Sequence, residues 1–310
     1  MAQLNICLFG KFSVYCNDQE IKCVNSQKAL ELFCFLLIYR NQAHYREAIA
    51  DKLWGGFKIE NTKKYLRKAL WQLQSSLDNI TSCPINDLIN VDPEWIEVNT
   101  RNYCWLDIET FEDAFQKVRG IRGNNLEKSD CFSLKQSINL YRGDLLDGWY
   151  QSWCILERER FKQMFIAMNS KLMSYCESNH EYESGIEFGN RLLRYEHAHE
   201  RTYRRLMRIH YLAGDRTTAL RLYERLKNVL QEELSVNPSE RTNQLYQQIV
   251  NGTEIYPKRV SKVKSQPPTS FLGVVNTLNR IKKRLTTQAK EQEKILSEID
   301  ELEKVFKDYD

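Results

Sequence analysis

The sequence lacks the features of a membrane protein or of a protein from an oxidising compartment. Its 310 residues contain no run of the roughly 18 apolar residues that a membrane span needs. The first residues, Met-Ala-Gln-Leu-Asn, show neither a basic segment nor an apolar stretch of signal length. The nine cysteines are scattered and never form Cys-x-x-Cys. We therefore expect a cytoplasmic protein without membrane contact, in which thiols such as Cys7, Cys16, Cys23 and Cys34 are small core residues.

Motifs of catalytic and cofactor sites are also missing. The chain has no Walker A sequence, no Gly-x-Gly-x-x-Gly loop and no nucleophile elbow. His197, His199 and Glu200 are close in sequence, but no further ligand follows at zinc-like spacing, which favours surface histidines. Glu157 and Glu159 lie in a charged stretch, where a solvated helix face is the ordinary interpretation. We expect no catalytic residue, no cofactor and no metal, and hence no enzyme.

The first 25 residues alternate between apolar and polar side chains in the manner of strands. Gly10 interrupts the pattern as a turn. The apolar positions are Leu4, Ile6, Leu8, Phe12, Val14, Cys16, Ile21 and Cys23. This pattern predicts a small antiparallel sheet at the N-terminus.

Helical periodicity follows over residues 26–77. Ser26 is a candidate N-cap of a first helix, a second helix is predicted from about Tyr45 to Trp54, and a third over residues 61–77. Two apolar stretches flanking Asp92-Pro93-Glu94 then predict a β-hairpin. Strands, three helices and a hairpin, in this order, are the layout of a winged helix.

The second half of the chain is predicted to be almost entirely helical. A polar, Gly-rich loop near residues 119–128 precedes a helical region over 132–250, with breaks at residues 142–144, 147–148, 214–215 and 237–238. Residues 180–186 align with residues 214–220 at an offset of 34, which is the period of tetratricopeptide repeats. Stacked repeats of this kind present a surface for binding proteins.

The last 60 residues change in composition. Residues 256–270 are polar, basic and proline-containing, as in a linker. Apolar residues from Leu278 to Phe306 then recur at heptad spacing, weakened in the middle by two glutamines. Two interpretations stay open: a coiled coil that joins two copies, or a helix that folds back on the repeat domain.

The predicted third helix has one cationic side. Lys64, Lys68, Trp71 and Ser75 lie opposite its apolar residues, with Arg67 and Gln74 on a flank, at about 100° per residue. Residues 61–77 contain no acidic side chain. Such a face suits the major groove of DNA, although a solvated surface gives the same pattern, and Trp71 could also pack on a neighbouring loop.

Several of these segments resemble the Streptomyces antibiotic regulatory protein (SARP) family. The resemblance covers about residues 4–250. The segments that carry it are Leu8-Phe9-Gly10, Arg46-Glu47, Leu53-Trp54, Leu66-Arg67-Lys68-Ala69-Leu70, Tyr141-Arg142-Gly143-Asp144, Gly214-Asp215-Arg216 and Glu233-Leu234 with Val236 and Pro238. It implies an OmpR-like winged helix that binds promoter direct repeats, followed by a bacterial transcriptional activation domain that helps to recruit RNA polymerase. Two features depart from the pattern: no ATPase or phosphopeptide-binding module follows, and the heptad segment is additional.

The resemblance also implies which residues contact DNA. The candidates are Lys63, Lys64, Arg67, Lys68, Trp71 and Ser75 of the third helix, and Arg101 after the hairpin. The hairpin would be the wing, but it carries Asp92, Glu94 and Glu97, which argues against a strong contribution to DNA binding.

The sequence thus predicts a mainly α protein with a small β part. Its predicted domains are a winged helix at 1–103, a TPR-like activation domain at 104–252, a basic linker at 253–274 and a heptad helix at 275–310. The predicted function is sequence-specific DNA binding coupled to transcription activation. The alternative is a helical-repeat adaptor whose winged helix contacts proteins and not DNA.

Overall fold

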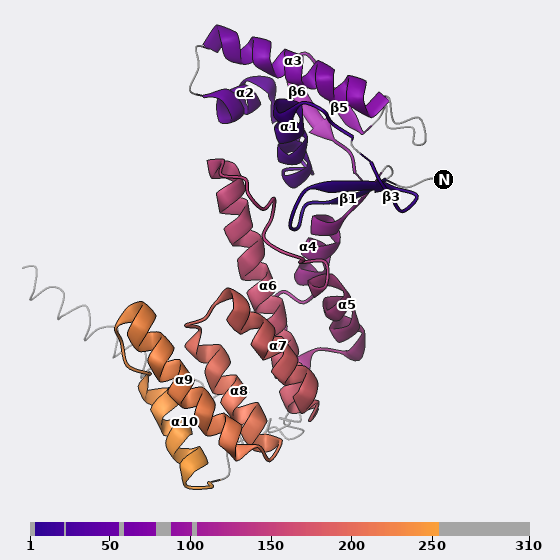
Figure 1. Ribbon diagram of the computed structural model, residues 1–310. Helices are drawn as coiled ribbons and strands as arrows, with labels where there is room; N and C mark the ends of the chain where they lie inside the picture. The colour runs from indigo at the N-terminus through magenta and orange to yellow at the C-terminus, as the bar shows by residue number, and fades with distance from the viewer. Residues whose placement is uncertain (1–3, 22, 56–58, 79–87, 101–103, 254–310) are drawn as a thin grey trace, which may run out of the picture. The chain divides into compact units, whose positions relative to one another are not determined.

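The computed structural model describes residues 4–21, 23–55, 59–78, 88–100 and 104–253. These residues belong to one unit, which ends at Thr253, and Figure 1 shows the course of its helices and strands. The predicted linker and heptad helix lie outside the described residues. Within the described part of the chain, no helix is both long and apolar enough to cross a membrane.

The N-terminal sheet has four strands in the order β3-β2-β1-β7. The strands are β1 (Leu4–Cys7), β2 (Ser13–Cys16), β3 (Gln19–Glu20) and β7 (Cys104–Leu106). Strands β1 and β2 pair antiparallel, as predicted, with Leu4 opposite Cys16 and Ile6 opposite Val14. The prediction of strand structure at Ile21 and Cys23 was wrong, because β3 ends at Glu20 and Cys23 is buried outside any strand. Strand β7, which was not predicted, pairs parallel to β1.

The three predicted helices and the hairpin are present. They are α1 (Gln27–Ile38), α2 (Arg46–Trp54), α3 (Ile59–Asp78), β5 (Ile89–Val91) and β6 (Trp95–Val98). Ser26 occupies the N-cap of α1, although its side chain makes no capping hydrogen bond. A short strand, β4 (His44–Tyr45), joins the hairpin to give a second sheet in the order β4-β6-β5. This arrangement confirms the winged helix.

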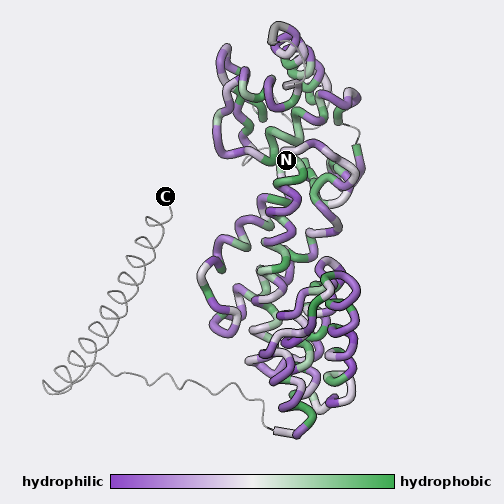
Figure 2. Tube along the Cα trace, turned by 90° about the vertical axis from the view of Figure 1, so that its left-hand side faces the viewer, coloured by the Kyte–Doolittle hydropathy of each residue, from purple (hydrophilic) through white to green (hydrophobic). Residues whose placement is uncertain are grey.

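The remainder of the described chain is helical. The elements are α4 (Asp107–Lys117), the 3-10 turn η1 (Gly123–Asn125), α5 (Lys128–Ile138), α6 (Ser152–Ser178), α7 (Tyr182–Tyr195), α8 (Glu200–Leu212), α9 (Arg216–Leu234) and α10 (Glu240–Val250). Each of the helices α6 to α10 contacts the next one along the chain. Along the tube in Figure 2, hydrophobic residues alternate with hydrophilic ones through these helices, as expected when one side of each is buried.

Helices α7 and α9 are the equivalent elements of the predicted repeat. The residues that open the two copies, His180 and Gly214, both adopt a left-handed backbone, with φ of 59° and 86°. Gly185 lies between two neighbouring helices: a Cβ there would lie 3.1 Å from Cδ1 of Ile209 in α8 and 3.3 Å from Cβ of Cys176 in α6. Its counterpart in the second copy, Ala219, is buried. The matched pairs Phe188 and Leu222, and Leu192 and Leu226, are buried.

The segment between β1 and β2 is hydrogen-bonded to, and packs against, the helical part of the chain. The N–H of Gly10 donates to the carbonyl of Asp144 (2.9 Å), and the N–H of Leu146 donates to the carbonyl of Leu8 (2.9 Å). The Phe9 ring is 2% exposed, and its centroid lies 5.0 Å from that of Phe111 and 5.4 Å from that of Phe161. Main-chain bonds and aromatic packing therefore tie the winged helix to the helices that follow it.

Buried polar groups complete this junction. The carboxylate of Asp107, at the start of α4, accepts hydrogen bonds from the N–H groups of Leu8 (2.8 Å), Phe9 (2.9 Å) and Ile108 (2.7 Å). Burial raises the pKa of the Asp107 carboxyl to about 6, although these hydrogen bonds oppose the rise. Arg158 of α6 donates to the carbonyls of Leu145 (3.0 Å), Leu146 and Trp149. These hydrogen bonds hold in place the loop before α6, which is bonded to the main chain after β1.

Candidate nucleic-acid interface

Helix α3 is amphipathic, and its apolar side forms the core of the winged helix. It contacts both α1 and α2. The buried residues recur in steps of three and four: Leu66, Ala69, Leu70, Leu73 and Leu77. This spacing places them on one side of a helix, as predicted. Because these apolar residues are buried, the side chains on the opposite side of α3 point away from the protein.

The opposite side of α3 is exposed and cationic. Lys63, Lys64, Arg67 and Lys68 are all exposed, and the Trp71 side chain is 68% exposed. Such exposure shows that Trp71 does not pack on a loop of the described chain, which was the alternative interpretation. Ser75 lies further along the helix and is half-buried.

The cations of α3 differ in their surroundings. The ammonium of Lys63 lies 2.6 Å from Oε1 of Glu47 in α2, and this hydrogen bond lowers the pKa of the Glu47 carboxyl. Lys64, Arg67 and Lys68 form no salt bridge with any described residue. Arg67 donates from Nε to the carbonyl of Lys63 (3.3 Å), which leaves the rest of its guanidinium to other partners. The positive charge available to a ligand is therefore concentrated on Lys64, Arg67 and Lys68.

The wing is acidic, as the sequence indicated. The side chains of Asp92, Glu94 and Glu97 are exposed on the β5–β6 hairpin. Arg101, the one predicted contact after the wing, lies outside the described residues. Among the described residues, the structure thus brings the α3 candidates together, and the wing adds no cation to them.

Arg46, the first residue of α2, is a neighbour of the wing that the site prediction omitted. Its main-chain N–H donates to the carbonyl of Glu94 (2.9 Å), and its guanidinium donates to the carbonyl of Asp92 (3.1 Å). Only the position of Arg46 directly after the predicted start of the second helix could have drawn attention to it. The pairing of β4 with the hairpin, which brings Arg46 to the wing, was not visible in the sequence.

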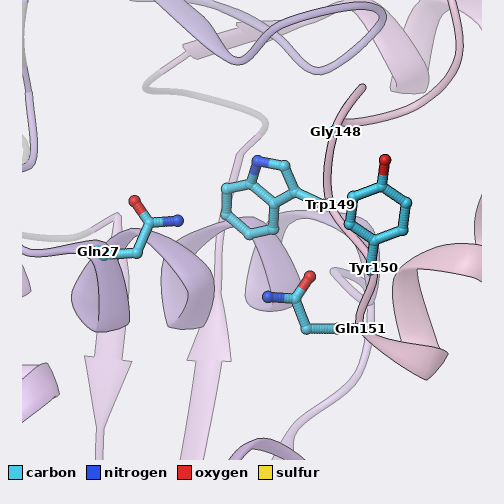
Figure 3. A pocket seen from close by; sticks show the side chains of 5 residues that line it. All are labelled: Gln27, Gly148, Trp149, Tyr150 and Gln151. Atoms are coloured by element: carbon cyan, nitrogen blue, oxygen red, sulfur yellow. The ribbon is translucent and has the colours of Figure 1, made fainter.

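A separate pocket of about 380 Å³ lies away from α3. Figure 3 shows Trp149 between Gln27 on one side and Tyr150 on the other, with Gln151 below and Gly148 above. None of the predicted DNA contacts lines it. Within the described chain, no group of three histidine, cysteine or acidic residues is placed to hold a metal ion. His199 hydrogen-bonds instead to the hydroxyl of Thr202 (2.6 Å).

Comparisons with known proteins agree with this architecture. Residues 106–250 match the family model of the bacterial transcriptional activator domain. No curated protein matches the sequence. Among solved structures, the chain is similar to Mycobacterium tuberculosis EmbR, determined in complex with a low affinity phosphopeptide, with a TM-score of 0.68 and 15% identity over 82% of this chain and 67% of that one. At this level of identity the likeness concerns the fold.

An activator domain that follows a winged helix defines a class, that of the bacterial transcription regulators.

Proposed function

We propose that this chain is a transcription regulator of the SARP type, which binds duplex DNA sequence-specifically through α3, at direct repeats in promoters, and activates transcription in the cytoplasm. The observation that carries the proposal is the exposed side of α3, where three cations have no acidic partner among the described residues. A duplex carries about one negative charge per 1.7 Å of its axis, so a helix of this kind gains free energy by displacing counterions from the phosphates.

The exposed residues of α3 are proposed to contact different parts of the DNA. Lys64 and Lys68 contact phosphates, because an ammonium acts as a point charge. Arg67 is suited to a guanine, whose O6 and N7 accept both donors of a guanidinium, and Trp71 offers apolar contact to a thymine methyl group. Lys63 contributes less, since Glu47 neutralises it, and Ser75 and Arg101 contact the backbone at the edges of the interface.

The helical part supplies the contacts to other proteins. We propose that the stacked helices α6 to α10 bind RNA polymerase, since stacked helical repeats form an extended concave surface that binds other proteins. We also propose that residues 275–310 join two copies into a homodimer; sedimentation of the full chain against a chain that ends at Asn251 tests this part.

Substitution of two cations on α3 tests the DNA-binding proposal. We expect Lys64→Ala/Arg67→Ala to weaken binding to a duplex selected from random sequences by about 10-fold or more at roughly 0.15 M salt. The slope of log K against log salt should also fall by about 1, since each phosphate that the protein neutralises adds about 0.9 to it and Lys64 is the phosphate contact of the pair. Fluorescence anisotropy at several salt concentrations measures both quantities.

The matched control is Arg221→Ala/Lys227→Ala, which removes the same charge from exposed positions of α9. It should leave affinity and slope unchanged. The proposal is wrong if the α3 variant, with an unaltered unfolding curve, binds the selected duplex as tightly and with the same slope as the original protein.

A further inference from the structure

The tip of the wing forms a surface that the DNA-binding proposal does not use. We call it the wing-tip surface; it consists of Tyr45, Asp92, Glu94, Trp95 and Glu97. Tyr45 is 55% exposed, and the three carboxylates are exposed as well. None of these carboxylates forms a salt bridge with a described residue. The surface therefore carries a concentration of negative charge beside two aromatic rings.

This surface is unsuited to DNA. Like charges repel, and phosphates brought near Asp92, Glu94 and Glu97 would have to approach them without the counterions that normally screen both. Arg46, which lies beside the tip, already uses its guanidinium to bind the carbonyl of Asp92. A wing of this composition selects for a positively charged ligand.

The wing-tip surface is also held in place by specific bonds. The N–H of Asp92 donates to the carbonyl of Trp95 (2.9 Å), which closes the turn, and Arg46 binds the carbonyls of Asp92 and Glu94. The rings of Tyr45 and Trp95 stack across the β4–β6 pair, with centroids 3.4 Å apart and planes inclined by 31°. Ordered rings bind a partner with a smaller entropic cost than mobile ones do.

A plate of aromatic rings with carboxylates beside it recognises cationic side chains. A guanidinium or ammonium is attracted to the ring faces of tryptophan and tyrosine, and the same group pairs with a carboxylate. Proteins that bind DNA next to this regulator carry basic surfaces for that purpose. Charge complementarity therefore favours a basic protein segment as the occupant.

We propose that the wing-tip surface docks an arginine- or lysine-bearing segment of the transcription machinery assembled on the same promoter. The proposal rests on the proposed DNA-binding function, because binding of α3 to the promoter brings the wing next to that machinery. The wing then takes part in activation through protein contact, alongside the helical repeat domain.

The test compares Asp92→Asn/Glu94→Gln with Asp18→Asn/Glu20→Gln. Both variants remove two exposed carboxylates of the same types from the winged helix, and asparagine tolerates the left-handed backbone of Asp18 (φ 63°). In calorimetric titrations at low salt, an arginine-rich dodecapeptide should bind the wing variant about fivefold more weakly than the original protein and the control. Equal affinity for all three proteins would overturn the proposal.

The second measurement uses the promoter complex. The wing variant should bind the selected duplex as tightly as the original protein, or up to about threefold more tightly, while recruitment of RNA polymerase holoenzyme falls about fivefold. A decrease in the DNA affinity of the wing variant would overturn the proposal, as would a change in self-association without a change in recruitment, which would identify a second copy as the occupant. If the original protein does not bind DNA, the DNA-binding proposal fails, and the peptide titration still decides whether the wing tip binds cations.

Discussion

Two faces of the same winged helix are built in opposite ways. The outer side of α3 consists of long, exposed side chains, and Lys63 alone among the α3 cations in the described chain has a salt-bridge partner. The face around Phe9 is buried, hydrogen-bonded through the main chain and packed with aromatic rings. The first face can change without cost to the fold, which suits the proposed adaptation of this surface to a DNA sequence. The second fixes the helical repeat domain to the winged helix.

The largest expected effect is on the buried face. Phe9→Ala should lower the free energy of unfolding by about 3–5 kcal/mol, because it removes a ring from between Phe111 and Phe161 and leaves a cavity. Urea unfolding followed by circular dichroism measures the change. Phe132→Ala is the matched control, since that ring is 66% exposed and its removal should cost little. Equal effects of the two substitutions would contradict the role assigned to Phe9.

A smaller, pH-dependent effect is expected at Asp107. Its pKa in the folded protein, about 6, lies above the ordinary value of 3.8, so the folded state binds more protons between these two values. The contribution of Asp107 to stability is therefore greatest below pH 4 and decreases as the pH rises toward 6, by about 2–3 kcal/mol in total.

Asp107→Asn removes this titration. The difference in urea midpoint between the original protein and Asp107→Asn should change between pH 4 and pH 6.5 and then level off. Asp113→Asn, an exposed change on the same helix, should give a constant difference over that range. A constant difference for Asp107→Asn as well would show that burial does not raise the pKa of its carboxyl.

The smallest effect on stability is expected on the exposed face. Trp71→Ala should change the free energy of unfolding by less than about 0.5 kcal/mol, because the side chain is 68% exposed. The same substitution should weaken binding to the selected duplex several-fold in an anisotropy titration, since it removes the apolar contact to a base. A large decrease in stability would mean that the two faces are not as different as the structure indicates.

The sequence predicted the elements that are determined by local patterns. The apolar spacing of Leu66, Leu70, Leu73 and Leu77 was sufficient to locate α3 to within two residues at either end. The offset of 34 residues likewise located the repeat of α7 and α9. In both cases one side of a helix is buried, and burial leaves a periodic signal.

The elements that tertiary pairing creates were not predicted. Strands β4 and β7 have two and three residues, too few for a period-two pattern, and they exist because β6 and β1 lie beside them. Helix α4 carries apolar residues at Ile108, Phe111 and Ala114 and could have been recognised. The sequence places Phe9 about 100 residues from Phe111, so nothing local shows that they touch. The hydrogen bonds of Arg46 likewise depend on residues distant in sequence, Asp92 and Glu94 of the wing.

Strand β7 lies at the boundary between the winged helix and the activator domain and connects the two. The match to the activator domain begins at residue 106, inside a strand whose partner is β1, near the other end of the winged helix. A single sheet thus contains residues from both sides of the start of this match. Because melting of β1 would break the hydrogen bonds of β7, we expect the winged helix and the helical part to unfold as one cooperative unit. The segment that matches a sequence family, residues 106–250, is therefore not the same as the segment that folds as a unit, which includes β1.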